Sequence, residues 1–304
     1  MKILLLITFA VGMQLGALLS FFFFPRSHLL SFTADQSTKT GDGDRPYDDH
    51  HHDDGEETVE AGWRNIAVYA GTIDAIAKTD DKWYGQFRQD IAVSSLLNNK
   101  TDGYFIDLAS NHPTFLSSTY ALERKFNWTG LCIEPNTMHW WGLSQQRKCQ
   151  LVGAVIGQKS MDIVKFRVKN VDGVGGHGGI IQKGMKNEGA PESESKSFVT
   201  VSAIDVFHRM DVPHHIDYMS LDVEGAEEFI MRAFPMEDFH ISLLSVEGST
   251  PSLGEFLVSN GFRMVARLGE DALWAHESIK DDLSSVQLTK YAATLRRNDP
   301  RLSE

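Results

Sequence analysis

The sequence predicts an α/β domain whose mostly parallel, seven-stranded sheet carries helices on both faces. Short apolar runs at residues 104–108, 130–134 and 217–223 each hold an acidic residue at or near their carboxyl end. One helix-length segment separates the first two runs, and alternating strands and helices are typical of a parallel sheet. A hairpin-sized connection at residues 268–271 joins the last two runs, so we expect the final strand pair to be antiparallel.

The other elements follow from hydrophobic spacing. Residues 63–100 are predicted to be mostly helical, because their apolar residues recur at helical intervals. Pro113 suits the first turn of the next helix, whose apolar face would run from Phe115 to Phe126. The later elements are expected as a strand at 151–156, a glycine-rich loop at 173–180, a strand and short helix within 198–210, a helix at 226–234, a strand at 241–246, a helix at 252–260, and a final strand pair at 262–267 and 272–275.

The composition fits a folded body joined to one strongly acidic segment. The chain has 304 residues and is 42% hydrophobic, which is enough for a sizeable core. Residues 35–60 contribute −8 of the net charge of −12, because ten acidic residues there outnumber two basic ones. The remainder is nearly neutral and lacks the basic character of a nucleic-acid-binding protein, so we expect no nucleic-acid partner.

An apolar run at residues 3–24 predicts a membrane anchor. As a helix, its 22 residues would span a hydrocarbon core of about 30 Å. The run ends in four phenylalanines, Pro25 and Arg26, which make a poor cleavage site. We therefore expect residues 1–25 to remain as an uncleaved signal anchor that attaches the chain to a membrane.

The rest of the chain divides into an acidic, disordered linker at residues 26–62 and a folded body at residues 63–304. The histidines at 50–52 lie in that linker, where we expect a solvated tether, and we predict no metal site. Two sequons for N-linked glycans, Asn99-Lys-Thr101 and Asn127-Trp-Thr129, favour a lumenal body. We expect a single-pass protein of the Golgi or endoplasmic reticulum, although the charge bias around the anchor is weak and leaves a cytosolic orientation open.

The two cysteines, Cys132 and Cys149, are too few for a disulfide framework or a structural zinc site. One lies in a predicted strand and the other just before the next strand, so the two side chains could meet. We nevertheless expect two buried, inert thiols.

Acidic residues at the ends of strands mark the expected site. In an open parallel sheet the ligand lies beyond the carboxyl ends of the strands, where the strand order reverses. Asp107, Glu134, Asp222 and Glu247 all fall at such ends. Glu134 is placed where a carboxylate can accept both hydroxyl groups of a ribose, so these runs predict a nucleoside cofactor.

Several of these runs resemble the FkbM family of methyltransferases. The similarity extends in order from about residue 83 to residue 279, and its most specific elements are Glu134-Pro-Asn136 and Asp222-Val-Glu-Gly-Ala-Glu227. It implies a Rossmann-like class I methyltransferase fold, S-adenosylmethionine as methyl donor, and O-methylation of a hydroxyl on a sugar, a glycan or a small metabolite. Membrane-anchored eukaryotic members of the family carry this kind of N-terminal anchor.

The residues at strand ends then receive expected roles. Asp107 would lie near the amino group of the cofactor, and Glu134 would hold its ribose. Asp222 and Glu224 are the predicted catalytic residues, because carboxylates suit a sulfonium and one of them would take the proton of the acceptor hydroxyl. The predicted cofactor-binding set is Asp107, Ala109, Asn111, Glu134, Pro135, Asn136, Asp222 and Ala154, the last of these beside adenine.

Two departures from the family pattern keep other functions open. Ala109 replaces the usual glycine, which lets the backbone approach the cofactor closely, and His112-Pro113 ends the turn where a small or acidic residue is usual. The alternative is a catalytically inactive, membrane-tethered binding or trafficking protein on the same fold. A glycosyltransferase would need a metal-binding Asp-x-Asp at a strand end, but Asp42-Gly-Asp44 lies in the linker.

Overall fold

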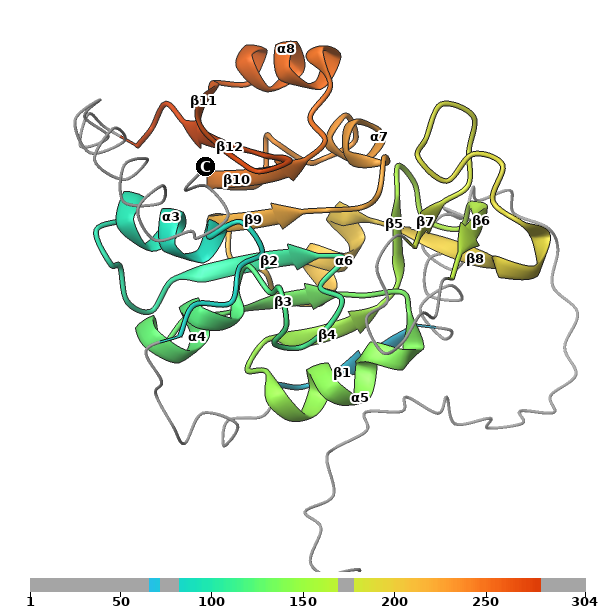
Figure 1. Ribbon diagram of the computed structural model, residues 1–304, viewed down its shortest axis with the longest axis horizontal. Coiled ribbons are helices and arrows are strands. Elements are labelled where there is room, and N and C mark those ends of the chain that lie inside the picture. Colours follow the sequence, from blue (N-terminus) through green and yellow to red (C-terminus); the bar gives the residue numbers. More distant parts are fainter. Residues whose placement is uncertain (1–65, 72–81, 169–177, 280–304) are drawn as a thin grey trace, which may run out of the picture. The chain divides into compact units, whose positions relative to one another are not determined.

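The computed structural model describes residues 66–71, 82–168 and 178–279 (Figure 1). The chain divides into two units, Met1–Asp35 and Gln36–Glu304, and every described residue belongs to the second unit.

The predicted anchor and linker, including the histidine tract, lie outside the described residues, as does most of the predicted glycine-rich loop at 173–180. Within the described ranges, no helix has both the length and the apolar character needed to cross a membrane. The anchor and the predicted domain boundaries therefore stay predictions.

An eight-stranded mixed sheet lies at the centre of the second unit, in the order β1-β4-β3-β2-β9-β10-β12-β11 (Figure 1). Strands β1 and β12 run opposite to the other six. The sheet therefore has one strand more than the seven expected, because β1 pairs with β4 at its edge. The bounds are β1 Ala67–Tyr69, β2 Tyr104–Leu108, β3 Thr129–Ile133, β4 Gln150–Gly153, β9 His215–Leu221, β10 His240–Glu247, β11 Phe262–Leu268 and β12 Asp271–His276.

Helices cover both faces of this sheet, as the sequence predicts (Figure 1). Neighbouring residues of β2 point to opposite faces: Phe105 packs with apolar residues of α3, α4 and α5, and Ile106 packs with those of α6, α7 and α8. The helix bounds are α3 Gln89–Leu96, α4 Tyr120–Phe126, α5 Thr137–Gln146, α6 Ala203–Arg209, α7 Glu227–Met231 and α8 Pro251–Ser259.

Two segments differ from the helices expected near the start of the body. The described part of residues 63–100 contains strand β1 before helix α3, so it is not mostly helical. Helix α4 begins at Tyr120 and not near Pro113. The Ser117 hydroxyl accepts the Tyr120 N–H at 3.1 Å, which satisfies one of the unpaired donors of the first turn.

A second, four-stranded sheet, in the order β5-β8-β6-β7, was not expected. Residues 151–156, predicted as one strand, divide between the two sheets, because β4 ends at Gly153 and β5 begins at Val155. The Trp140 ring lies so close to Gly153 that an added Cβ would come within 2.2 Å of it. The bounds are β5 Val155–Gly157, β6 Ile163–Arg167, β7 Gly179–Ile180 and β8 Ser195–Ser202.

The expectation of two inert thiols is wrong, since Cys132 and Cys149 form a disulfide with their Cα atoms 5.8 Å apart. The register of β3 and β4 accounts for this pairing. Leu151 lies opposite Cys132, and Cys149 precedes Leu151 by two residues. Both sulfur-bearing side chains are buried on the face covered by α3, α4 and α5.

Candidate active site

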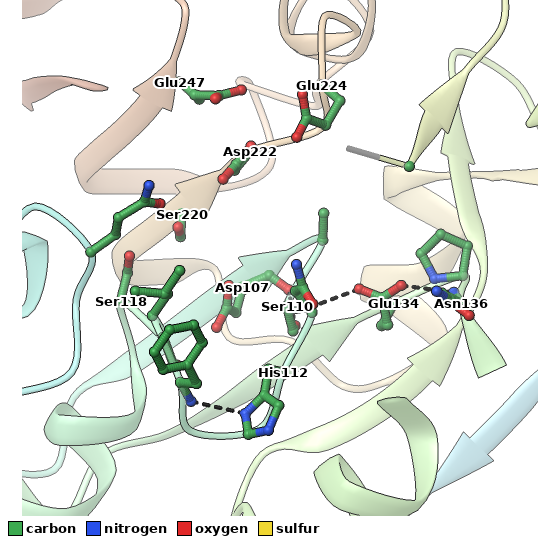
Figure 2. Close-up of a pocket in the computed structure, with 18 of the residues that line it drawn as sticks. Asp107, Ser110, His112, Ser118, Glu134, Asn136, Ser220, Asp222, Glu224 and Glu247 are labelled. Atoms are coloured by element: carbon green, nitrogen blue, oxygen red, sulfur yellow. Dashed lines mark hydrogen bonds between the residues drawn. The ribbon is translucent and has the colours of Figure 1, made fainter. Parts of the chain in front are cut away.

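A cavity of about 470 Å³ opens at the carboxyl ends of the central strands (Figure 2). The strand order reverses between β2 and β9, because β3 and β4 follow on one side and β10 follows on the other. This is where open α/β sheets bind ligands. The predicted residues that line the cavity are Asp107, Ala109, Asn111, Glu134, Pro135, Asn136, Asp222, Glu224 and Glu247.

Glu134 follows β3 directly, and backbone N–H groups hold both of its carboxylate oxygens. Oε2 accepts from the Asn111 N–H at 2.8 Å, and Oε1 accepts from the Asn136 N–H at 2.7 Å (Figure 2). Burial raises the pKa of Glu134 to about 7, although these two bonds oppose the shift. Each oxygen keeps a further lone pair, so the carboxylate can accept two more hydrogen bonds from a ligand.

The turn after β2 presents backbone and side-chain groups to the same part of the cavity. Ala109 and Asn111 both have left-handed backbone angles, with φ of 66° and 53°. The N–H groups of Ala109 and Ser110 donate to the Ile133 carbonyl at 2.9 and 3.2 Å, which ties the turn to β3. Asn111 Oδ1 is buried without a hydrogen-bond partner among the described residues, so a ligand donor would satisfy it.

Asn136 and His112 stabilise the backbone around the cavity. Asn136 caps α5 by accepting the Met138 N–H at 3.2 Å. His112 Nδ1 accepts the N–H groups of Thr114 and Phe115 at 3.2 and 2.9 Å, and burial lowers the pKa of His112. The ring of His112 thus organises the loop that follows it as well as lining the cavity.

Three carboxylates gather at the other end of the cavity. Asp222 follows β9, Glu224 lies in the next turn, and Glu247 ends β10, with one oxygen of each within 4.8 Å of the others (Figure 2). Lys186 Nζ forms ion pairs with Glu224 at 3.4 Å and with Glu247. The chain itself therefore supplies a cation to part of this cluster.

Asp222 is an exposed residue that faces the cavity, yet many protein atoms lie around its carboxyl group. The resulting loss of hydration raises the pKa of Asp222 well above its usual range, and the negative charges of Glu247 and Glu224 add to this shift. A carboxyl group with a raised pKa accepts a proton more readily than an ordinary carboxylate does.

Ala154 is the one predicted site residue that the structure places elsewhere. It lines a second, largely apolar cavity of about 30 Å³, which shares Ala109, Pro135, Phe166 and Gly178 with the larger one. That volume is enough for about two water molecules and far too small for an adenine ring.

The second sheet contributes a wall of the cavity that was not predicted from the sequence. Phe166 and Arg167 of β6, together with Gly178, line it, and Ser220 contributes from β9. Apolar and polar side chains partly alternate along residues 163–167, which only weakly indicates a strand. Nothing in the sequence indicated that this strand would reach the ends of β2 and β9.

The chain matches no protein-family model, and no curated protein matches it. It is similar to a solved structure, the precorrin-6y C5,15-methyltransferase from Geobacter metallireducens GS-15, with a TM-score of 0.33 and 13% sequence identity over 67% of this chain and 99% of that chain. At that score the fold assignment rests on the strand order and not on the similarity.

Proposed function

We propose that this chain is an S-adenosylmethionine-dependent methyltransferase that transfers a methyl group to a hydroxyl on a sugar, a glycan or a small metabolite. The observation that carries the proposal is the carboxylate of Glu134, held by two backbone N–H groups at the reversal of strand order. Strand β12, antiparallel between β10 and β11, is also typical of the methyltransferase sheet that the sequence resemblance implies.

The larger cavity has groups that fit the polar parts of this cofactor. Glu134 would accept the ribose hydroxyls, and Asn111 Oδ1 would gain the donor that it lacks. Asp107 would bind the cationic amino group. Adenine would lie toward Pro135 and Ala154, where the apolar cavity must widen to admit it.

The carboxylates at the other end suit the chemistry of transfer. S-adenosylmethionine supplies an electrophilic methyl group on a positively charged sulfur. Asp222 is the group that we assign to accept the proton of the acceptor hydroxyl, because its raised pKa makes it a stronger base than an ordinary carboxylate. Glu224 would orient the acceptor, and its ion pair with Lys186 fixes its position.

The same proposal includes a membrane anchor at residues 1–25 and a lumenal body in the Golgi or endoplasmic reticulum. The disulfide supports this location, since disulfides persist in oxidising compartments and are rare in the cytosol. Partners would be the acceptor and the membrane, with no nucleic acid.

A catalytically inactive binding or trafficking protein remains the second candidate, and two observations favour it. Ala109 has a left-handed φ in the turn where the family usually has glycine. The space beside Ala154 is too small for adenine. The two functions differ in whether the chain binds S-adenosylmethionine.

Titration calorimetry on the full-length protein in detergent, with S-adenosylmethionine and S-adenosylhomocysteine, tests the proposal. We expect saturable binding that Glu134→Ala weakens at least about tenfold, because a charge-assisted contact to the ribose is lost. Glu192→Ala is the matched control, since this exposed glutamate pairs with Lys165 away from the cavity lining and should leave the affinity unchanged. A folded wild-type protein that binds neither ligand would contradict the enzyme assignment and favour the binding protein.

A further inference from the structure

Arg147 follows α5 and is fully buried, which is rare for arginine unless its charge is paired. Its Nε donates to Glu123 Oε2 at 2.9 Å, and its Nη2 donates to Thr119 Oγ1 at 2.6 Å. Nη1 donates to the Pro113 carbonyl and to the Ser117 hydroxyl, both at 3.3 Å. The guanidinium is therefore held in one orientation beneath the cavity.

Thr119 connects Arg147 to Asp107. Arginine can only donate hydrogen bonds, so the Thr119 oxygen must accept from Arg147. A hydroxyl has a single proton, and the Thr119 proton is donated to Asp107 Oδ2. Because this hydroxyl is fully buried, no water competes for it. Asp107 is thereby fixed through one oxygen, which leaves Oδ1 for the cavity that Asp107 lines.

The charges of this network do not cancel. Glu123 is fully buried and forms the closer ion pair with Arg147. Its oxygens also accept hydrogen bonds from the N–H groups of Lys148 and Cys149, at 3.2 and 3.0 Å. Arg147 lies farther from Asp107, with Nη1 3.9 Å from Oδ2. When both carboxylates are ionised they share one guanidinium, so one negative charge remains, and Asp107 presents it to the cavity.

We propose that Arg147 and Thr119 are positioning residues that hold Asp107 as an oriented anion, so that it binds the cationic amino group of the ligand. This inference rests on the function proposed above and explains how the site keeps a charge in a buried place. The disulfide supports the network from two sides, because Cys149 donates to Glu123 and Cys132 lies beside Asp107 in register.

The groups around Asp107 determine how its pKa would change if the Thr119 hydroxyl were removed. Burial raises the pKa of Asp107, whereas Arg147 and the Thr119 hydrogen bond lower it, and Glu123 raises it again. Among the described residues, the titratable groups Glu134 and Tyr218 also interact with Asp107. Loss of the Thr119 hydroxyl should therefore raise the pKa of Asp107 and favour its neutral form.

The test compares Thr119→Val, which keeps the shape and removes the hydroxyl, with Thr119→Ser, which keeps the hydroxyl. The first readout is the pKa of Asp107 from carboxyl ¹³C NMR of the full-length protein, assigned by comparison with Asp107→Asn. The second is the affinity for S-adenosylhomocysteine, measured by calorimetry between pH 6 and pH 8. If Thr119→Val does not fold, Thr119→Ala removes the same hydroxyl without adding bulk.

We expect Thr119→Val to raise the pKa of Asp107 and to weaken binding by about tenfold, because a neutral Asp107 would lose its charge-assisted hydrogen bond to the amino group of the ligand. Thr119→Ser should match the wild type in both. An unchanged pKa in Thr119→Val would overturn the proposal, and so would an equal loss in Thr119→Ser. If the wild type binds no ligand, the proposed function fails, and the pKa measurement alone still decides whether Thr119 positions Asp107.

Discussion

Ala109 is a residue at which the sequence and the local geometry disagree. Its φ of 66° lies in the left-handed region, where a Cβ costs about 1–2 kcal/mol. Asn111, with a similar φ, is a residue type that tolerates this region better. The strain at Ala109 is retained at the edge of both cavities.

We therefore expect Ala109→Gly to stabilise the protein. The gain should be roughly 0.5–1 kcal/mol, because the greater freedom of glycine in the unfolded chain offsets part of the relieved strain. Urea unfolding of the wild type and the variant measures the difference. Ala154→Gly is the control, since Ala154 has no left-handed φ and its substitution should destabilise. A less stable Ala109→Gly variant would show that the methyl group contributes more by packing than it costs in strain.

Residues at the ends of strands could be assigned to the candidate site from the sequence, whereas residues in loops could not. Asp107, Glu134 and Asp222 could be placed at the cavity from the sequence, because strand ends are recognisable and parallel strands end at one edge. Arg147 and Lys186 were not found, because they reach the site from loops. Arg147 stands in a polar run, Gln145-Gln-Arg-Lys148, that gives no sign of burial.

At the scale of elements, helix α5 begins beside the cavity and contains a buried histidine, His139, in its first turn. Asn136 caps this helix, and the His139 N–H donates to the Asn136 carbonyl at 3.1 Å. His139 is 4% exposed, and its Nε2 has no hydrogen-bond partner among the described residues. Burial and the nearby His112 lower the pKa of His139 to about 4.

This shift predicts a loss of stability on acidification. The unfolded chain takes up a proton at His139 near pH 6.5, whereas the folded chain does so only near pH 4, so stability falls as the pH drops between these values. The contribution is up to about 3 kcal/mol. Urea unfolding at pH 7.5, 6.5, 5.5 and 4.5 should show a smaller decline for His139→Gln than for the wild type. Parallel curves for the two proteins would mean that His139 is not the group responsible.

Element boundaries were harder to predict than element order. Strand β9, helix α8 and the antiparallel pair β11 and β12 lie close to the expected positions, because each has a clear apolar run with turn residues at its ends. Helix α5 was not predicted. Trp141 in this helix is 73% exposed, so the apolar residues of α5 do not all lie on one buried face and give no clear helical pattern. The division of residues 151–156 depends on Trp140 packing against Gly153, a contact that no local pattern reveals.

At the scale of the whole molecule, the two sequons allow the proposed lumenal location of the body to be tested. Asn99 and Asn127, the acceptor residues of the two sequons, are both exposed. If the body is lumenal, we expect the protein made in animal cells to carry N-linked glycans.

Treatment with an endoglycosidase that removes N-linked glycans should then increase the mobility of the protein in gel electrophoresis. The double substitution Thr101→Ala with Thr129→Ala destroys both sequons and should abolish the shift. An unchanged mobility of the wild type would count against the lumenal orientation, and protease protection of the body in intact vesicles would provide an independent check.

The Cys132–Cys149 disulfide also affects how the protein can be prepared. The bond closes a loop with a sequence separation of 17, and such a cross-link contributes about 3 kcal/mol to stability. A chain synthesised in a reducing bacterial cytosol would keep two thiols in the middle of its core. In that reduced protein, the disulfide would no longer constrain the strands beside Glu123 and Asp107. If such a preparation bound no ligand, the result would apply only to the reduced protein. Preparations should therefore be made in a secretory host and checked for free thiols before any affinity is interpreted.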